Sequence, residues 1–121
     1  EELPIISCIF NNNNLGMVRQ WQKLFYGKRY SMTCLHSGAA CRGKCGEVEC
    51  PPYTPDFIRL AESYGAKGIR VTKKEDIEPA FREAMKSKKT PYIIEFEFDP
   101  EDLVYPMVEP GGTLRDLIMD C

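Results

Sequence analysis

Apolar positions near the start of the chain form first a continuous run and then a helical spacing. Residues 3–10 are almost all apolar, which predicts a strand buried on both faces of a sheet. Residues 15–26 follow a helical period and predict a helix capped by Asn14. The side chains expected on the apolar face of this helix are Met17, Val18, Trp21, Leu24 and Phe25.

The middle of the chain predicts a second helix followed by a short strand. Thr54 and Pro55 are typical of a helix start, as the cap and the first helical residue. Gly65 is typical of the residue that follows a helix. Residues 66–71 then predict the strand.

A third helix comes next, and its start has two interpretations. A capping box over residues 72–75 would start it early, but Pro79 conflicts with that start. Alternatively, Asp76 is the cap and Pro79 lies in the first turn.

The last strand is predicted over residues 91–99. Apolar and polar positions alternate there, so one face should be buried and the other partly wet, as on a strand near a sheet edge. Glu95 and Glu97 are expected on the solvated face. Residues 100–121 predict an extended tail with one short helix at 113–119.

This order of elements predicts an α/β fold, a three-layer sandwich in which helices cover a mostly parallel sheet. The chain starts with Glu1 rather than Met, and the first strand follows almost at once. We therefore expect a piece of a longer polypeptide, with a fold that is incomplete at its N-terminus.

Composition narrows the function classes. With 121 residues, 43% of them hydrophobic and 28% charged, the chain matches one soluble globular domain. A net charge of −2 gives no basic footprint for nucleic acid. No apolar run could span a bilayer, and no secretory signal is visible. We expect a cytoplasmic location and neither nucleic acid nor membrane as a partner.

Cysteines gather in a loop over residues 27–53, where glycine and proline interrupt all periodicity. Cys34, Cys41, Cys45 and Cys50 are spaced C-x6-C-x3-C-x4-C. Three interpretations stay open: a zinc site or an iron–sulfur cluster, reduced thiols, or disulfides within the loop. Cys8, in the first strand, is expected to be a small core residue.

The run from Asn11 to Asn14 carries the clearest chemistry. It follows the carboxyl end of a strand, which is where ligands bind in open α/β sheets. Amide oxygens of Asn are hard donors that suit Mg²⁺, and the helix N-terminus behind them suits a phosphate. Gly16, without a Cβ, would let the backbone approach a diphosphate closely.

The same stretch carries a resemblance to a known family. Gly16-Met17-Val18 followed by Gln20-Trp21-Gln22 resembles the catalytic large subunit of acetohydroxyacid synthase, also called acetolactate synthase. The match resumes at Pro55-Asp56-Phe57 and ends at Pro106-Met107-Val108. It covers nearly the whole chain except residues 35–53. The resemblance implies that residues 1–121 are the C-terminal portion of a thiamine-diphosphate-binding domain, with a Cys-rich inserted loop at 34–53.

The resemblance also implies roles for single residues. Asn12 would bind Mg²⁺ through its side chain and Asn14 through its backbone carbonyl. The third protein ligand, the Asp of a Gly-Asp-Gly motif, falls before Glu1. Gly16 and Met17 would contact the cofactor, while Met17, Val18 and Trp21 would shape the pocket for the second keto acid. The catalytic Glu of the family lies in another domain, so no residue of this chain is expected to be catalytic.

The implied reaction is the condensation of two 2-keto acids with loss of CO2, pyruvate with pyruvate or 2-oxobutyrate, for branched-chain amino acid biosynthesis. The resemblance further implies a homodimer or tetramer formed through the thiamine site, a small regulatory subunit, and FAD in the full-length protein. This chain alone is expected to be inactive. Two alternatives stay open: another thiamine-diphosphate decarboxylase or carboligase, and a non-catalytic, zinc-stabilised binding module.

Overall fold

The computed structural model describes residues 2–35 and 54–119. The chain divides into two compact units. Unit 1 comprises residues 1–13 and 52–99, and unit 2 comprises residues 14–51 and 100–121. We describe each unit separately. In the described part of the chain, no helix is long and apolar enough to cross a membrane.

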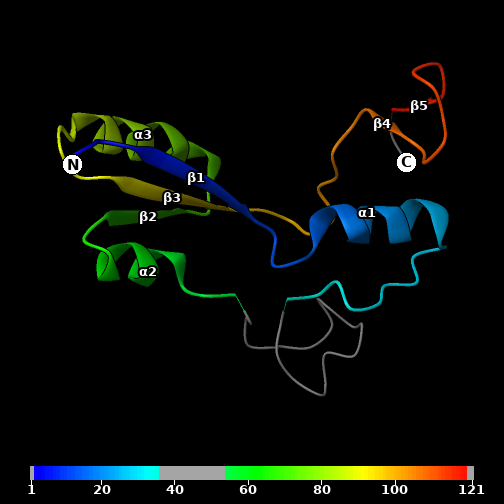
Figure 1. Ribbon diagram of the computed structural model, residues 1–121, viewed down its shortest axis with the longest axis horizontal. Coiled ribbons are helices and arrows are strands. Elements are labelled where there is room, and N and C mark those ends of the chain that lie inside the picture. The colour runs from blue at the N-terminus through cyan, green and yellow to red at the C-terminus, as the bar shows by residue number, and fades with distance from the viewer. Residues whose placement is uncertain (1, 36–53, 120–121) are drawn as a thin grey trace. The chain divides into compact units, whose positions relative to one another are not determined.

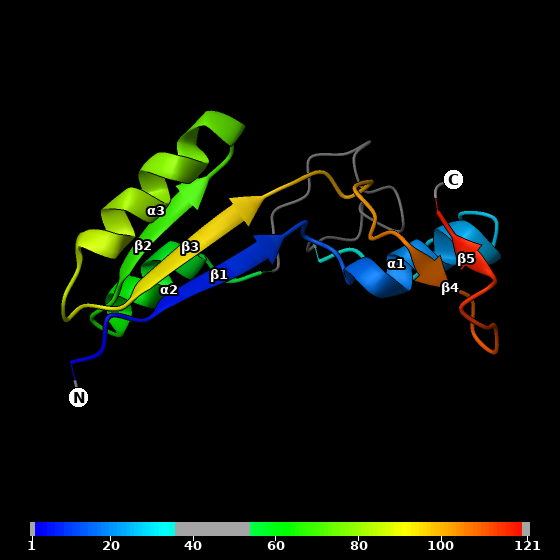
Figure 2. The same cartoon turned by 90° about the horizontal axis from the view of Figure 1, so that it is seen from above.

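Unit 1 is built on a three-stranded parallel sheet (Figures 1 and 2). Its strands are β1 (Ile6–Asn11), β3 (Tyr92–Glu97) and β2 (Lys67–Val71), in the order β1-β3-β2. Helices α2 (Phe57–Ser63) and α3 (Ile77–Lys86) cover opposite faces of the sheet (Figure 1). The predicted sandwich, with a parallel sheet between helices, is therefore confirmed.

The core of unit 1 lies between the sheet and α3. Small residues of α3 let it pack closely against the strands, and large apolar side chains fill the space between them. The buried residues of this cluster are Val71, Ala80, Ala84, Tyr92 and Ile94. Phe81 and Phe96 pack on the cluster with their rings stacked at 6.0 Å.

On the other face, Gly68 lets α2 approach β2 closely. A Cβ added to Gly68 would lie 2.8 Å from Cγ2 and 2.9 Å from Cα of Ile58. The second of these atoms belongs to the helix backbone, so a side-chain rotation cannot relieve the overlap. The absence of a side chain at Gly68 therefore sets the distance between this helix and the sheet.

The predicted places of the first and last strands are wrong. β1, expected to be buried on both faces, forms one edge of the described sheet, and its Phe10 is 73% exposed. Cys8, expected in the core, is exposed on the same strand. β3, expected near an edge, is the central strand, and its Glu95 is only 2% exposed. The alternating pattern wrongly predicted a solvated Glu95. The carboxylate is stabilised by an ion pair with Arg70 and not by hydration.

Two of the predicted helix starts are also corrected. The N-cap of α2 is Asp56 rather than Thr54, and its carboxylate accepts hydrogen bonds from the Ile58 and Arg59 amides. Helix α1 (Gly16–Phe25) starts after Leu15, without a side-chain cap from Asn14. The observed N-caps, Leu15 and Asp56, lie one and two positions after the predicted ones.

Two other predicted helix boundaries hold. Asp76 is the N-cap of α3, after a short 3-10 turn, η1 (Lys74–Asp76), so Pro79 falls in the first helical turn. Gly65 follows α2 with a φ of 74°, a left-handed conformation that suits glycine.

Unit 2 contains α1 and the tail of the chain. The tail forms a small antiparallel pair, β4 (Met107–Val108) and β5 (Leu117–Ile118). The helix predicted at 113–119 is wrong, because the Asp116 carboxylate accepts hydrogen bonds from the Thr113 amide and hydroxyl and closes a turn there. These local bonds compete with helix formation.

Polar side chains tie α1 to the tail. Arg19 and Lys23 donate to the Glu101 carboxylate at 2.6 and 3.1 Å. The Gln20 side chain bonds both backbone groups of Val104, at 2.7 and 3.2 Å. Because Arg19 and Gln20 are buried, these bonds replace water that the two side chains have lost.

Gly68→Ala should lower the free energy of unfolding by about 1–3 kcal/mol, the usual cost of overpacking. The new methyl group would force α2 away from β2. Chemical denaturation of the purified protein measures the change. Glu62→Ala, at an exposed position of α2, is the control and should leave the unfolding midpoint unchanged. Equal midpoints for both variants would contradict the close approach at Gly68.

The contact of Glu101 with α1 should be lost in acid. Arg19, through its hydrogen bond, lowers the pKa of Glu101 below its usual value of 4.5. A lowered pKa in the folded state means that the stabilisation is present above pH 4.5 and disappears as the pH falls further. Glu101→Gln should therefore lower the melting temperature near neutral pH and have little effect in acid.

Thermal unfolding of both proteins across this range measures the difference. The control is Glu78→Gln, which removes an exposed carboxylate paired with Arg82 in α3. If Glu101→Gln changed the melting temperature by the same amount at every pH, the lowered pKa of Glu101 would be contradicted.

Candidate functional site

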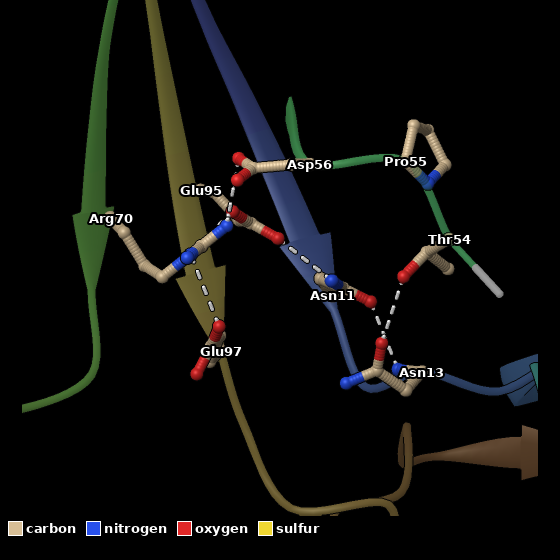
Figure 3. A pocket seen from close by; sticks show the side chains of 8 residues that line it. All are labelled: Asn11, Asn13, Thr54, Pro55, Asp56, Arg70, Glu95 and Glu97. Atoms are coloured by element: carbon tan, nitrogen blue, oxygen red, sulfur yellow. Dashed lines mark hydrogen bonds and ion pairs between the residues drawn. The ribbon is translucent and has the colours of Figure 1, made fainter. Parts of the chain in front are cut away.

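The carboxyl ends of the three parallel strands form a polar pocket of about 220 Å³ (Figure 3). All of its residues belong to unit 1. They come from the ends of the strands and from the segment that precedes α2 (Figure 3). The residues that line it are Asn11, Asn13, Thr54, Pro55, Asp56, Arg70, Glu95 and Glu97.

A buried carboxylate lies at the base of this pocket. Oε2 of Glu95 accepts from Nε of Arg70 at 2.9 Å, and Oε1 accepts from Nδ2 of Asn11 at 2.8 Å. Burial of an ionised carboxylate is costly unless a cation and hydrogen bonds offset the loss of water. Arg70 supplies the cation and Asn11 the second hydrogen bond.

Arg70 joins three carboxylates. Besides Glu95, its guanidinium pairs with Asp56 at 3.2 Å and with Glu97 at 3.2 Å. The hydrogen bond to Glu95 is the main reason why the pKa of Arg70 is raised further. The amide of Arg59, which donates to Asp56, is the main reason why the pKa of that carboxyl is lowered. Arg70 and Asp56 therefore stay charged across the neutral range.

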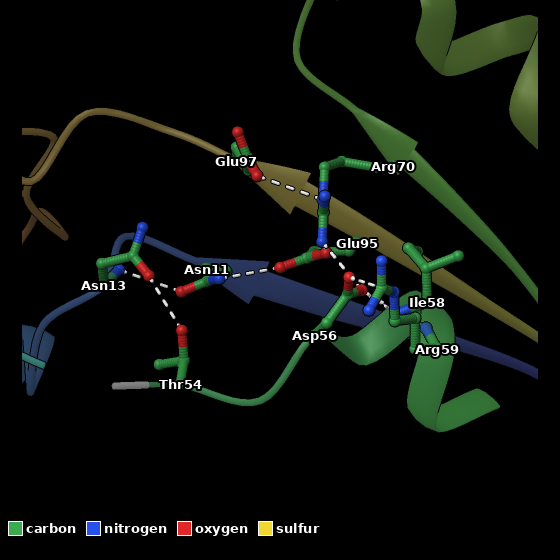
Figure 4. Close-up of polar contacts among 9 residues, drawn as sticks. All are labelled: Asn11, Asn13, Thr54, Asp56, Ile58, Arg59, Arg70, Glu95 and Glu97. Atoms are coloured by element: carbon green, nitrogen blue, oxygen red, sulfur yellow. Dashed lines mark hydrogen bonds and ion pairs between the residues drawn. The ribbon is translucent and has the colours of Figure 1, made fainter. Parts of the chain in front are cut away.

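The Asn run begins in the same pocket. Oδ1 of Asn11 accepts from the Asn13 amide at 2.9 Å, so the side chain of Asn11 closes a tight turn across Asn12. Asn13 has a φ of 54°, in the left-handed region that Asn tolerates better than most residues. Its Oδ1 accepts from the Thr54 hydroxyl at 3.1 Å. The turn after β1 is thus held from two sides (Figure 4).

The residues predicted to hold cofactor and metal fall in both units. Asn12 lies in unit 1, directly after β1. Asn14 lies in unit 2, is buried, and forms an isolated bridge with Cys34. Gly16 and Met17 are the first two residues of α1. The roles predicted for these four residues stay predictions.

The donors of the run suit a magnesium ion in kind. Amide and carbonyl oxygens are neutral hard donors, and Mg²⁺ usually adds one or two carboxylates and the phosphates of its substrate. Asp56, Glu95 and Glu97 are all paired with Arg70. Among the described residues, no group of three or more His, Cys, Asp or Glu side chains could hold a metal. In kind, the amide and carbonyl oxygens of the run therefore fit Mg²⁺.

A second, mostly apolar pocket of about 320 Å³ lies on α1 and the residues that follow it. Val18 and Trp21, two of the residues predicted for the substrate pocket, line it together. Met17 is exposed and is not part of its lining. Gln22, Tyr26 and Arg29 also line it, and the sequence interpretation missed them. The helical spacing from Val18 to Gln22 and Tyr26 was the available signal.

The cysteine cluster lies largely outside the described residues, which include Cys34 but not Cys41, Cys45 or Cys50. Cys34 is disulfide-bonded. The predicted disulfides within the loop stay a prediction. Metal binding by the cluster stays a prediction.

Comparisons with known proteins give the family. Residues 1–96 match the model described as "Thiamine pyrophosphate enzyme, C-terminal TPP binding domain". The chain is 42% identical over 117 residues to the acetolactate synthase large subunit of Corynebacterium glutamicum, covering 97% of this chain. It is 38% identical, with the same coverage, to the probable acetolactate synthase large subunit of Methanocaldococcus jannaschii. In both cases the chain spans 17% of the relative's length.

A solved structure of a thiamine diphosphate-dependent enzyme also matches the chain. The thiamine diphosphate-dependent 4-hydroxybenzoylformate decarboxylase of Rhodococcus jostii RHA1 matches with a TM-score of 0.55 and 26% identity. The match covers 81% of this chain and 15% of that one. Together with the family model, it confirms the resemblance read from the Asn run and from α1. The chain belongs to the thiamine pyrophosphate enzymes and matches their C-terminal TPP-binding domain over residues 1–96.

Proposed function

We propose that this chain supplies part of the cofactor site of an acetolactate synthase. The observation that carries the proposal is the Asn run at the carboxyl end of β1, followed at once by α1 with Gly16 and Met17 at its start. Relatives named acetolactate synthase, at 38% and 42% identity over 97% of the chain, support this choice within the family.

In this proposal the Asn run holds the metal and the diphosphate. The side-chain oxygen of Asn12 and the backbone carbonyl of Asn14 would bind Mg²⁺, and Gly16 would let the diphosphate approach the backbone. Thiamine diphosphate, when bound, stabilises the carbanion left when a 2-keto acid loses CO2. Met17 would contact the cofactor and help to hold its shape.

The pocket on α1 would receive the second keto acid. Val18 and Trp21 present an apolar surface there, which would exclude water from the reacting carbon. The acceptors would be pyruvate and 2-oxobutyrate, and the products would enter branched-chain amino acid biosynthesis. The Glu that protonates the cofactor and the Asp that completes the metal site would come from outside this sequence.

The proposed assembly is a cytoplasmic homodimer or tetramer formed through the thiamine site. FAD in a separate domain and a small regulatory subunit are part of the same proposal. The chain spans only 17% of the length of the relatives it matches, so these features concern the longer polypeptide.

A second candidate is a thiamine-dependent decarboxylase, because the matching solved structure is titled as one. The two activities differ in what happens after CO2 leaves. A synthase adds the remaining fragment to a second keto acid, whereas a decarboxylase releases an aldehyde.

A product assay separates these candidates. The longest natural polypeptide that carries this chain is supplied with Mg²⁺, thiamine diphosphate, pyruvate and 2-oxobutyrate. It should form the branched 2-hydroxy-2-methyl-3-oxo acid from two pyruvates and the 2-ethyl-2-hydroxy-3-oxo acid from pyruvate and 2-oxobutyrate. Mass spectrometry detects these products. Acetaldehyde as the sole product would contradict the synthase proposal and favour the decarboxylase.

Asn12→Ala should weaken Mg²⁺ binding to that polypeptide by at least about tenfold, since even the loss of a residue that only supports a ligand has this effect. Calorimetric titration with Mg²⁺ at saturating thiamine diphosphate measures it. Lys73→Ala, at an exposed position before α3, is the control. Unchanged Mg²⁺ affinity in Asn12→Ala would contradict the proposed role of this residue.

A further inference from the structure

We propose that Glu95, neutralised by Arg70, is a positioning residue for the metal site: it fixes the side-chain amide of Asn11 and thereby the turn that carries Asn12. This inference rests on the proposed function, in which Asn12 binds Mg²⁺. It assigns a role to a buried carboxylate and its Arg70 partner, which are not themselves proposed as metal ligands or as catalytic groups.

The first step is the orientation of the Asn11 amide. The Glu95 carboxylate pairs with the Arg70 guanidinium and accepts hydrogen bonds through both oxygens, so the NH2 group of Asn11 must face it, at 2.8 Å. The oxygen of the same amide must then point the opposite way, where it accepts from the Asn13 backbone at 2.9 Å. The carboxylate thus selects one of the two amide orientations, the one that closes the turn.

The second step is the effect on Asn12. The hydrogen bond from the Asn13 amide to the Asn11 side chain spans Asn12, so the backbone on both sides of Asn12 is held. The Thr54 hydroxyl adds a second anchor by donating to Asn13 (Figure 4). A ligand on a fixed turn loses less conformational freedom when it binds a metal than one on a loose turn.

The third step is what holds Glu95 itself. Its side chain is on the central strand, and Arg70 bonds it from the neighbouring strand at 2.9 Å. Arg70 is in turn fixed by Asp56, whose carboxylate caps α2. Figure 4 shows these contacts running from α2 through Arg70 and Glu95 to Asn11 and Asn13. The turn is therefore tied to a helix and to all three strands of unit 1.

The test uses Glu95→Gln in the longest natural polypeptide that carries this chain. Gln has nearly the same shape, but one of its two polar atoms donates, so it cannot accept from both Asn11 and Arg70. We expect the Kd for Mg²⁺, titrated calorimetrically at saturating thiamine diphosphate, to rise about tenfold or more. The turnover number at saturating Mg²⁺ should return close to that of the parent protein.

A merely structural role predicts a different result. In that case Glu95→Gln lowers the melting temperature and leaves the Kd for Mg²⁺ unchanged, and the inference is overturned. Glu78→Gln is the matched control, since it makes the same change in an exposed carboxylate that pairs with Arg82. Both its melting temperature and its Mg²⁺ affinity should equal those of the parent protein.

Asn11→Ala provides a second, milder variant at the end of an edge strand, which keeps the inference testable if Glu95→Gln fails to fold. It should raise the Kd for Mg²⁺ as Glu95→Gln does. Because Glu95 is proposed to act through Asn11, the double variant should bind Mg²⁺ no more weakly than Asn11→Ala alone. Additive losses, or an unchanged Kd in Asn11→Ala, would overturn the inference.

Asn12→Ala separates the inference from the proposed function. If Asn12→Ala weakens Mg²⁺ binding and the Asn11 and Glu95 variants do not, the proposed function stands and the positioning role is overturned. If Asn12→Ala leaves Mg²⁺ binding unchanged, the proposed function fails and takes the inference with it.

Discussion

The ion pair between the buried Glu95 and the exposed Arg70 is the interaction on which the architecture of unit 1 depends. In the parallel register these two residues are direct partners on neighbouring strands. Glu95 also faces β1 on its other side, where it reaches Asn11, two residues beyond its own partner Ile9. Only a strand between β1 and β2 can make both contacts, so the strand order β1-β3-β2 and the polar pocket require each other.

This pair also explains where sequence reasoning failed. Helices and strands were predicted from periodicity because each element buries one face, and those predictions hold for β2, α3 and the end of α2 at Gly65. The place of a strand within the sheet depends on partners that are distant in sequence. Glu95 looked solvated because an alternating pattern cannot show that Arg70, 25 residues earlier, removes the cost of its burial.

Local competition accounts for the remaining errors. Thr54 has the chemistry of a helix cap, but its hydroxyl donates to Asn13, and Asp56 caps α2 instead. Thr113 and Asp116 bond each other in a turn and so prevent a helix in the tail. The pattern of the Asn run pointed to the carboxyl edge of a strand, and the pocket lies there. The role of each amide came only from the family resemblance, because spacing alone does not distinguish a ligand from a turn residue.

The chemistry of position 11 shows why an amide is needed there. The residue must donate to the Glu95 carboxylate and accept from the Asn13 amide within one short side chain. Asp has the right length but no donor, and it would place a second negative charge against a buried one. Ser is too short to reach both partners, and Gln would place its amide one carbon further out. Asn11 thus separates a cluster in which each carboxylate contacts Arg70 from a turn that offers neutral oxygens. This separation lets the Asn run follow directly on three carboxylates that all pair with Arg70.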